Sequence, residues 1–445
     1  MQHLVQRPPL LNRLLASARQ TLPETRALAQ RLGPGLITGA ADDDPSGIAT
    51  YSQAGAQFRF GLVWTLLLTT PLMIGIQMLS ARIGWVTGEG LAANIAKLCP
   101  SWLTLGLVSL LVVANTINIA ADIGAMAEAA RLLAGGHNTT YIVLFGAACV
   151  LGQVFFSYER SVRILKWLTL ALFAYFAVVM VVQVPFRQAL TESLAPWRYL
   201  PKDVAMADYA SMVVAVLGTT ISPYLFFWQA AQEVEDSHRR PDAAELKGDR
   251  AYAEEHLFRI KQDTYIGMLF SNAIALCIVL ATAVTLNLHG ITQIQTAAQA
   301  AEALRPVAGE FAFAVFALGI IGTGLLAVPV LAGSAAYAVS EVFGWKAGLS
   351  QGFHEARGFY AIIIAATAIG ALMSWYELDP IRALVWSAVV NGVISVPIMV
   401  VMMWVGQSRR LMGALTITLR HRLFGWAATA VMAVAVLVML ATSLG

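Results

Sequence analysis

The sequence predicts an all-α, polytopic membrane protein with eleven transmembrane helices. Three observations carry this prediction: a composition too apolar for water, eleven apolar runs that suit a bilayer, and lysines and arginines that gather in alternate loops. Together they indicate that lipid, rather than water, is the solvent of this chain.

The composition excludes most soluble classes of protein. Hydrophobic residues make up 58% of the 445 residues and charged residues only 12%, with a mean hydropathy of +0.68. In a soluble domain, about a quarter of the residues are charged. A net charge of +3 is too small to indicate nucleic-acid binding. Cys99, Cys149 and Cys277 lie far apart and form no CxxC pair, so neither a zinc site nor a disulfide framework is indicated.

The apolar runs give the expected spans. A transmembrane helix needs about 20 predominantly apolar residues. Runs of this kind, separated by connections rich in charge, proline or glycine, cover about 34–57, 61–80, 103–131, 141–156, 163–184, 208–232, 264–287, 311–340, 358–374, 381–404 and 423–442. No run long enough for a signal peptide precedes the first of them, so we expect the first span itself to direct insertion.

The basic residues give the expected topology. With a cytoplasmic N-terminus, 22 of the 29 lysines and arginines fall in cytoplasmic loops, as the positive-inside rule requires. The outer side then keeps only Arg59, Arg131, Arg187, Arg198, Lys202, Arg305 and Arg382. We therefore expect a protein of the cell (inner) membrane with its C-terminus outside. The hydrophilic stretch 233–263 is expected to form a cytoplasmic loop with some helix.

Three successive aspartates, Asp42 to Asp44, interrupt the first apolar run and are followed by Pro45, Ser46 and Gly47. Each carboxylate inside a membrane costs about 3 kcal/mol or more, so the group must face water, cations or helix ends. Proline cannot donate a backbone hydrogen bond and disfavours helix at the preceding residue. We expect an unwound turn at mid-membrane, which is tolerated only where it lines a protein cavity. The alternative is that the aspartates cap the span at the membrane surface.

The sixth run is interrupted in a similar way, by the polar residues Thr219, Thr220 and Ser222 before Pro223. Asp44-Pro45 and Ser222-Pro223 each open one half of a ten-span set. Because five is odd, the two halves have opposite orientations in the membrane. Paired interruptions in two inverted halves indicate a binding site near the midplane.

The predicted organisation has four parts. Residues 1–32 form a cytoplasmic N-terminal segment, and residues 33–206 form a first five-span repeat that is broken near 42–47. Residues 207–405 form a second repeat that is broken near 219–223, and residues 406–445 contain the eleventh span.

These motifs resemble those of a known family. Gly33-Pro34-Gly35, Asp44-Pro45 and Ala49-Thr50 resemble the first span of the Nramp metal transporters, which carries D-P-G-N. Leu217-Gly218, Thr220 and Pro223 resemble the family's sixth span, which carries M-P-H. The resemblance implies a LeuT-like fold of two inverted five-helix repeats plus one extra helix, working by alternating access.

The departures from the family pattern bear on the substrate. Gly47 stands where the family has asparagine, Ser222 where it has methionine, and Tyr224 where it has histidine. Losing a thioether favours harder ions such as Mg²⁺. Asp122 matches a family acid and Arg357 a basic position, whereas Asn115 replaces an acid that the family ties to proton movement.

Two substrate hypotheses remain open. In the first, a divalent cation (Mg²⁺ or Mn²⁺) binds Asp44, Asp42 and Asp43 attract it, and oxygens of Ser222, Thr219, Thr220 and the Ala41 carbonyl complete the shell. In the second, Ser46, Gly47, Thr219, Thr220, Ser222 and Tyr224 surround a bicarbonate-like anion at helix N-termini. The aspartates would then bind a coupling Na⁺ or H⁺, helped by Thr323 or Ser334. We favour the cation; a channel is a third possibility.

Further polar residues mark a candidate pathway. Asn115, Asn118 and Asp122 share one face of the third span, which indicates either an aqueous lining or hydrogen bonds between helices. Gln229 in the sixth span and Asn391 in the tenth are candidates of the same kind.

Catalysis is not expected. The seven histidines fall in loops or near span ends, and none lies beside the aspartates to serve as base or zinc ligand. We expect no cofactor beyond transported or coupling ions, a lipid bilayer and an inorganic ion as partners, and a monomer.

Overall fold

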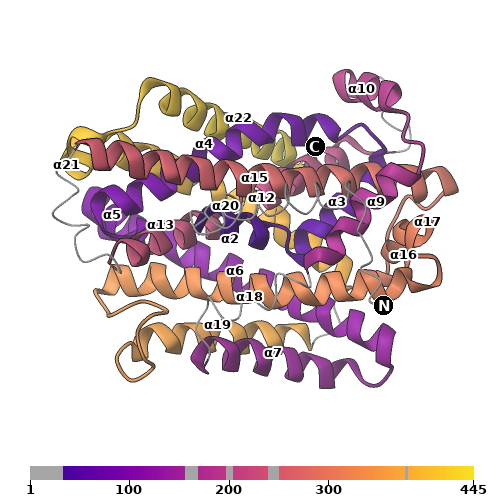
Figure 1. Cartoon of the computed structure of the whole chain (residues 1–445), viewed down its shortest axis with the longest axis horizontal. Coiled ribbons are helices and arrows are strands. Elements are labelled where there is room, and N and C mark those ends of the chain that lie inside the picture. Colours follow the sequence, from indigo (N-terminus) through magenta and orange to yellow (C-terminus); the bar gives the residue numbers. More distant parts are fainter. Residues whose placement is uncertain (1–33, 156–168, 197–203, 239–249, 376–378, 445) are drawn as a thin grey trace, which may run out of the picture.

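The computed structural model describes residues 34–155, 169–196, 204–238, 250–375 and 379–444, and these residues form helices and connections without a β-strand. Most of the long helices run along one direction of the molecule (Figure 1). The principal elements are α2 (Pro34–Asp42), α3 (Pro45–Phe58), α4 (Val63–Thr87), α5 (Leu91–Leu98), α6 (Ser101–Ala134), α7 (Asn138–Phe155), α9 (Phe173–Val181), α10 (Phe186–Leu194), α12 (Met206–Thr220), α13 (Pro223–His238), α15 (Arg250–Thr285), α18 (Ala312–Phe343), α19 (Arg357–Ser374), α20 (Pro380–Gln407) and α22 (Leu419–Leu444).

Nine helices in the described residues are long and apolar enough to cross a membrane. A tenth is possible if α9 and α10, which meet at 104°, form one span. The expected first span falls outside this count because α2 and α3 are short and flank three aspartates. Residues 163–168 of the expected fifth span lie outside the described residues. The protein is a multi-pass membrane protein. The total of eleven spans remains a prediction.

Some expected regions are only partly visible. The N-terminal segment 1–32 and loop residues 239–249 lie outside the described part of the chain. Residues 250–263, in the stretch expected to form a loop with some helix, form the first part of α15.

Close backbone contacts position the two broken spans. A Cβ atom on Gly39 of α2 would lie 2.3 Å from the Gly267 carbonyl oxygen of α15, and one on Gly218 of α12 would lie 2.2 Å from the Ala388 carbonyl oxygen of α20. Small residues let membrane helices approach to this distance. Any larger residue would push the broken helices away from their supports.

α6 and α18 pack as an antiparallel pair behind the breaks. Asn115 of α6 hydrogen-bonds to Ser334 of α18, while Met126 lies against Gly324, so residue numbers rise along one helix as they fall along the other. α6 therefore crosses the molecule with its polar face held between α18 and the first break.

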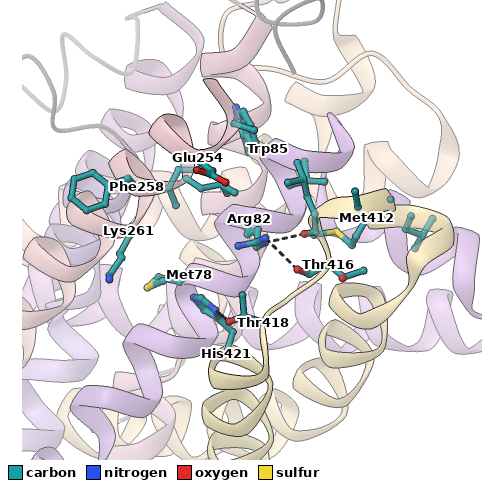
Figure 2. Close-up of a pocket in the computed structure, with 18 residues that line it drawn as sticks. Met78, Arg82, Trp85, Glu254, Phe258, Lys261, Met412, Thr416, Thr418 and His421 are labelled. Carbon is teal, nitrogen blue, oxygen red and sulfur yellow. Dashed lines mark hydrogen bonds between the residues drawn. The ribbon is translucent and has the colours of Figure 1, made fainter. Parts of the chain in front are cut away.

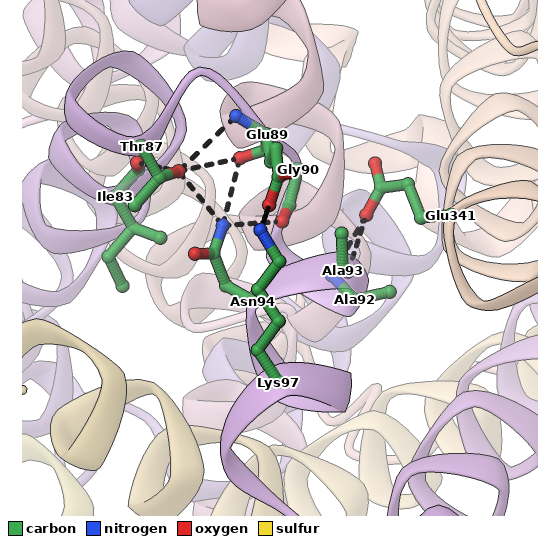
Figure 3. A network of polar contacts seen from close by, with 9 residues as sticks. All are labelled: Ile83, Thr87, Glu89, Gly90, Ala92, Ala93, Asn94, Lys97 and Glu341. Carbon is green, nitrogen blue, oxygen red and sulfur yellow. Dashed lines mark hydrogen bonds and ion pairs between the residues drawn. The ribbon is translucent and has the colours of Figure 1, made fainter. Parts of the chain in front are cut away.

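A polar network fixes the turn between α4 and α5 (Figure 3). Glu341 of α18 accepts hydrogen bonds from the backbone amides of Ala92 (2.9 Å) and Ala93 (3.2 Å), and so caps the start of α5. Asn94 donates to the carbonyl of Gly90 at 2.8 Å. This buried cap ties α5 to α18 across 249 residues of sequence.

Candidate functional site

The first break lies at Asp43 and Asp44, between α2 and α3. Asp44 has an extended backbone (φ −72°, ψ 170°) and caps α3, since its Oδ1 atom accepts a hydrogen bond from the Gly47 amide at 2.6 Å. Pro45 carries no N–H and therefore leaves the Ala41 carbonyl without its helical partner. The break thus exposes one backbone acceptor and one fixed carboxylate.

The second break lies at Ile221 and Ser222, between α12 and α13. Pro223 leaves the Thr219 carbonyl without its helical donor for the same reason. Here the Ser222 hydroxyl supplies the donor, 2.9 Å from the Thr219 oxygen and equally close to that of Gly218. Ser395 of α20 donates to the freed Ile221 carbonyl at 2.8 Å, which holds the break against α20.

The two breaks meet through Tyr224. Its hydroxyl donates to the Ala41 carbonyl at 3.1 Å and lies 3.5 Å from Asp44 Oδ2. Asn118 of α6 donates to the same carboxylate oxygen at 3.1 Å. All four residues are buried, with Asp44 2% exposed, so these contacts form in the interior of the helix bundle.

Asp42 and Asp43 share a partner that the sequence interpretation did not include. The Ser271 hydroxyl of α15 lies 2.6 Å from Asp42 Oδ2 and 3.2 Å from Asp43 Oδ1. One hydroxyl has only one proton, so it serves one carboxylate at a time. A signal was available in the sequence, because Ser271 and Asn272 are polar residues inside an otherwise apolar run.

Unpartnered oxygens gather along the first break and the polar face of α6. The following buried oxygens of acids and amides lack a hydrogen-bond partner among the described residues: Asp42 Oδ1, Asp43 Oδ2, Asn118 Oδ1, and both Oδ atoms of Asp122. Thr50, Tyr51 and Ser52 of α3 contribute three further unpartnered hydroxyls. Buried polar atoms are normally paired, and these carboxylate and amide oxygens can only be paired by a donor or a cation.

Several predicted hydroxyls are turned away from the break. Ser46 donates to the Leu384 carbonyl of α20 at 2.9 Å and contacts Ser387. Thr220 donates into its own helix, to Val216 at 2.9 Å. These protons are committed to backbone carbonyls: Thr220 forms the i→i−4 bond common for threonine within a helix, and Ser46 bonds to the neighbouring helix α20.

Glycine at position 47 leaves room that another side chain fills. A Cβ atom there would lie 3.2 Å from Thr219 Oγ1 and 3.4 Å from Asp44 Oδ1. The Thr219 hydroxyl of the second break therefore lies beside the backbone of the first.

The candidate pathway residues divide into two groups. Asn115 donates to the Leu331 carbonyl (2.9 Å) and Ser334 Oγ (2.7 Å), a link between α6 and α18. Asn118 and Asp122 lie one turn apart toward the first break. Thr323 is 11 residues from Ser334 on α18, about 16 Å by helix rise, so the two cannot serve one ion site.

The remaining predicted residues lie at different distances from the break. Gln229 joins three helices, accepting from Gln77 at 2.6 Å and donating to Thr264 at 3.0 Å. Asn391 lies one turn before Ser395 on α20, and its buried Oδ1 lacks a partner among the described residues. Arg357 is exposed as the first residue of α19 and does not reach the break.

Comparison with known proteins gives consistent matches over most of the chain. Residues 35–442 match the family described as natural resistance-associated macrophage protein-like. Proteins named divalent metal cation transporter MntH are similar in sequence. The one from Acidiphilium cryptum is 28% identical over 433 residues (94% of this chain, 92% of that protein), and one from Klebsiella pneumoniae is 26% identical over 411 residues (90% and 91%).

Two solved structures show the same fold. The Eremococcus coleocola manganese transporter in complex with an aromatic bis-isothiourea substituted compound superposes with a TM-score of 0.66 at 17% identity, covering 92% of this chain and 85% of that one. MhsT in complex with L-phenylalanine gives a TM-score of 0.58 at 13% identity, covering 92% and 98%. The architecture is LeuT-like.

Proposed function

This chain belongs to the natural resistance-associated macrophage protein-like (Nramp) family, and on that premise we propose that it transports a divalent cation by alternating access. The proposed site lies between the two breaks, with Asp44 as the charged ligand. Its relatives are named as metal cation transporters, which supports the class of substrate.

The observation that carries this proposal is the excess of unpartnered acceptors beside Asp44. Asp42, Asp43 and Asp122 present carboxylate oxygens that no described residue pairs, and Asn118 presents an amide oxygen. Leaving such atoms buried and unpaired is costly, and a cation removes that cost. An anion would add acceptors to a region that already has too many.

The ligand chemistry favours a hard ion. At the two breaks the candidate ligands are oxygens of carboxylate, amide and hydroxyl groups: Asp44, Asn118, Thr219, Ser222 and Tyr224. Ser222 and Tyr224 stand where the family carries thioether and imidazole. Oxygen ligands suit Mg²⁺ and Mn²⁺, and Mg²⁺ binds with few protein ligands because it keeps several waters. We therefore propose Mg²⁺ or Mn²⁺ as the substrate, and Asp122 as a residue of the ion pathway.

The anion hypothesis meets a specific obstacle. It needs hydroxyl protons at the break, yet Ser46, Thr220 and Ser222 donate theirs to backbone carbonyls. Withdrawing the Ser222 proton would leave the Thr219 carbonyl, which has no helical donor, unpaired at about 1–3 kcal/mol.

Uptake by the purified protein in liposomes tests the proposal. Mg²⁺, Mn²⁺ and labelled bicarbonate are each offered with and without Na⁺ and pH gradients. We expect saturable uptake of at least one metal and none of bicarbonate. Bicarbonate uptake without metal uptake would establish the anion hypothesis instead, and flux that does not saturate would indicate a channel.

A further inference from the structure

A second polar pocket lies away from the breaks, where the ends of three helices meet (Figure 2). Its volume is about 1000 Å³, and α4, α15 and the segment leading into α22 line it. Arg82 lies five residues before the end of α4, and His421 two residues after the start of α22. Lys261 lies on α15 just before its apolar part begins at Thr264. The pocket is therefore at the depth where helices leave the hydrocarbon.

The charge of this pocket is unbalanced. The cations Arg82 and Lys261 line it, against the single carboxylate of Glu254, and His421 adds an imidazole. Neither Arg82 nor Lys261 forms an ion pair with a carboxylate in the described part of the chain. Residues 405–445 add Arg409, Arg410, Arg420 and Arg422 and contain no aspartate or glutamate.

Arg82 is held in place rather than free on the surface. Its Nε atom donates to the Leu415 carbonyl at 3.1 Å, and its Nη2 atom donates to the Thr416 carbonyl at 3.2 Å (Figure 2). Nη1 has no such partner among the described residues, so part of the guanidinium is left for a ligand. Arginine presents several donors in a fixed fork that suits a phosphate group.

The remaining walls are apolar and open toward lipid. Met78, Leu257 and Met412 line the pocket. Further along the two helices that bear Lys261 and His421, Leu269 of α15 is 49% exposed and Leu423 of α22 is 62% exposed. In a membrane protein, such exposed apolar side chains near helix ends face acyl chains. The pocket thus joins a cationic end to an apolar end, which is the pattern of a phospholipid rather than of a small soluble anion.

We propose that this pocket binds an anionic glycerophospholipid, with its phosphate at Arg82, Lys261 and His421 and its acyl chains along α15 and α22. Basic pockets between helices at a membrane surface bind lipid headgroups in this way. The expected topology places the pocket on the cytoplasmic side. The proposal does not depend on the identity of the transported ion.

Native mass spectrometry of the full chain in detergent tests this site directly. Phosphatidylglycerol, phosphatidylcholine with the same acyl chains, and glycerol phosphate are titrated separately. We expect phosphatidylglycerol to bind most tightly. The double substitution Arg82→Gln with Lys261→Gln should weaken its binding about 25-fold, because each basic side chain contributes about fivefold.

Matched variants separate the charge of the pocket from general effects. Arg131→Gln with Arg305→Gln removes two exposed arginines elsewhere and should leave binding unchanged. Ala414→Trp fills the pocket without altering charge and should weaken phosphatidylglycerol binding as well. Equal binding of the two lipids, an unaffected Ala414→Trp variant, or the same loss in the control pair would overturn the proposal. Equal competition by glycerol phosphate would assign the pocket to free anions instead.

Discussion

Each break leaves a backbone carbonyl without its helical donor, and the two breaks satisfy that carbonyl in different ways. At each, a proline deprives a carbonyl four residues earlier of its helical donor, Ala41 in the first and Thr219 in the second. The second break repairs this locally with the hydroxyl of Ser222. The first is repaired from outside, by Tyr224 of the other broken span. The first break therefore depends on the second for its geometry.

Their charges differ as well. The first break gathers three buried carboxylates with oxygens to spare, whereas the polar groups of the second include hydroxyls that donate to their own backbone. We therefore propose a division of roles: the first break supplies the charge that binds an ion, and the second supplies the frame that positions it. Each substitution below removes a side chain that contributes to one of these two roles.

Asp44→Ala should have the largest effect, a loss of uptake of about 100-fold or more, because it removes the charged ligand and the cap of α3 together. Liposome uptake of Mn²⁺ measures it. Glu302→Gln, which neutralises a partly exposed acid that pairs with Arg305, is the matched control and should retain uptake. Near-normal uptake by the Asp44 variant would remove the proposed site.

Tyr224→Phe should come next, because it removes the hydroxyl that links the second break to Ala41 and Asp44. The unpaired Ala41 carbonyl should lower the free energy of unfolding by about 1–3 kcal/mol. Uptake should fall about tenfold, because losing a hydrogen bond worth about 1.4 kcal/mol lowers the affinity by about that factor. Thermal unfolding in detergent and uptake are compared with Tyr141→Phe, whose ring is only partly buried. A variant indistinguishable from that control would show that the breaks are positioned without Tyr224.

The contacts at the two breaks show which features a single sequence can predict and which it cannot. Pro45 and Pro223 located both breaks, since the missing N–H acts locally. The partners Ser271 and Ser395 escaped prediction because they lie on other helices, more than 170 residues away. The direction of two hydroxyls was not predicted either. Ser46 and Thr220 were expected at the site, but Ser46 donates to a carbonyl of α20, which packing sets, and Thr220 donates within its own helix. The apolar runs predicted most helix positions well, because the bilayer imposes their length.

Ser271→Ala should reduce uptake more modestly, by several-fold. It removes the one proton that Asp42 Oδ2 and Asp43 Oδ1 share, and so costs one hydrogen bond, but it does not touch Asp44. Ser340→Ala is the control, because its buried hydroxyl has no partner among the described residues. An equal change in both variants would mean that Asp42 and Asp43 do not contribute through this contact.

Gly47→Asn with Ser222→Met should alter the selectivity among metals more than it alters whether the protein transports. Restoring an amide and a thioether should raise binding of Mn²⁺ and Cd²⁺ relative to Mg²⁺. Thr219 must shift by a few tenths of an ångström to admit a side chain at position 47, so Gly47→Ala is the steric control. If competition assays show the same selectivity as the parent protein, then the frame of the second break, and not only these two ligands, differs from that of the family.

The most direct test of the central claim is a Mn²⁺ and Mg²⁺ binding isotherm of the purified protein in detergent, beside that of Asp44→Asn. This substitution keeps the shape of the side chain and removes its charge. We predict one saturable metal site in the parent protein and its loss in the variant. Binding of equal affinity in both proteins, or no binding of either metal by the parent, would contradict a cation site at the first break.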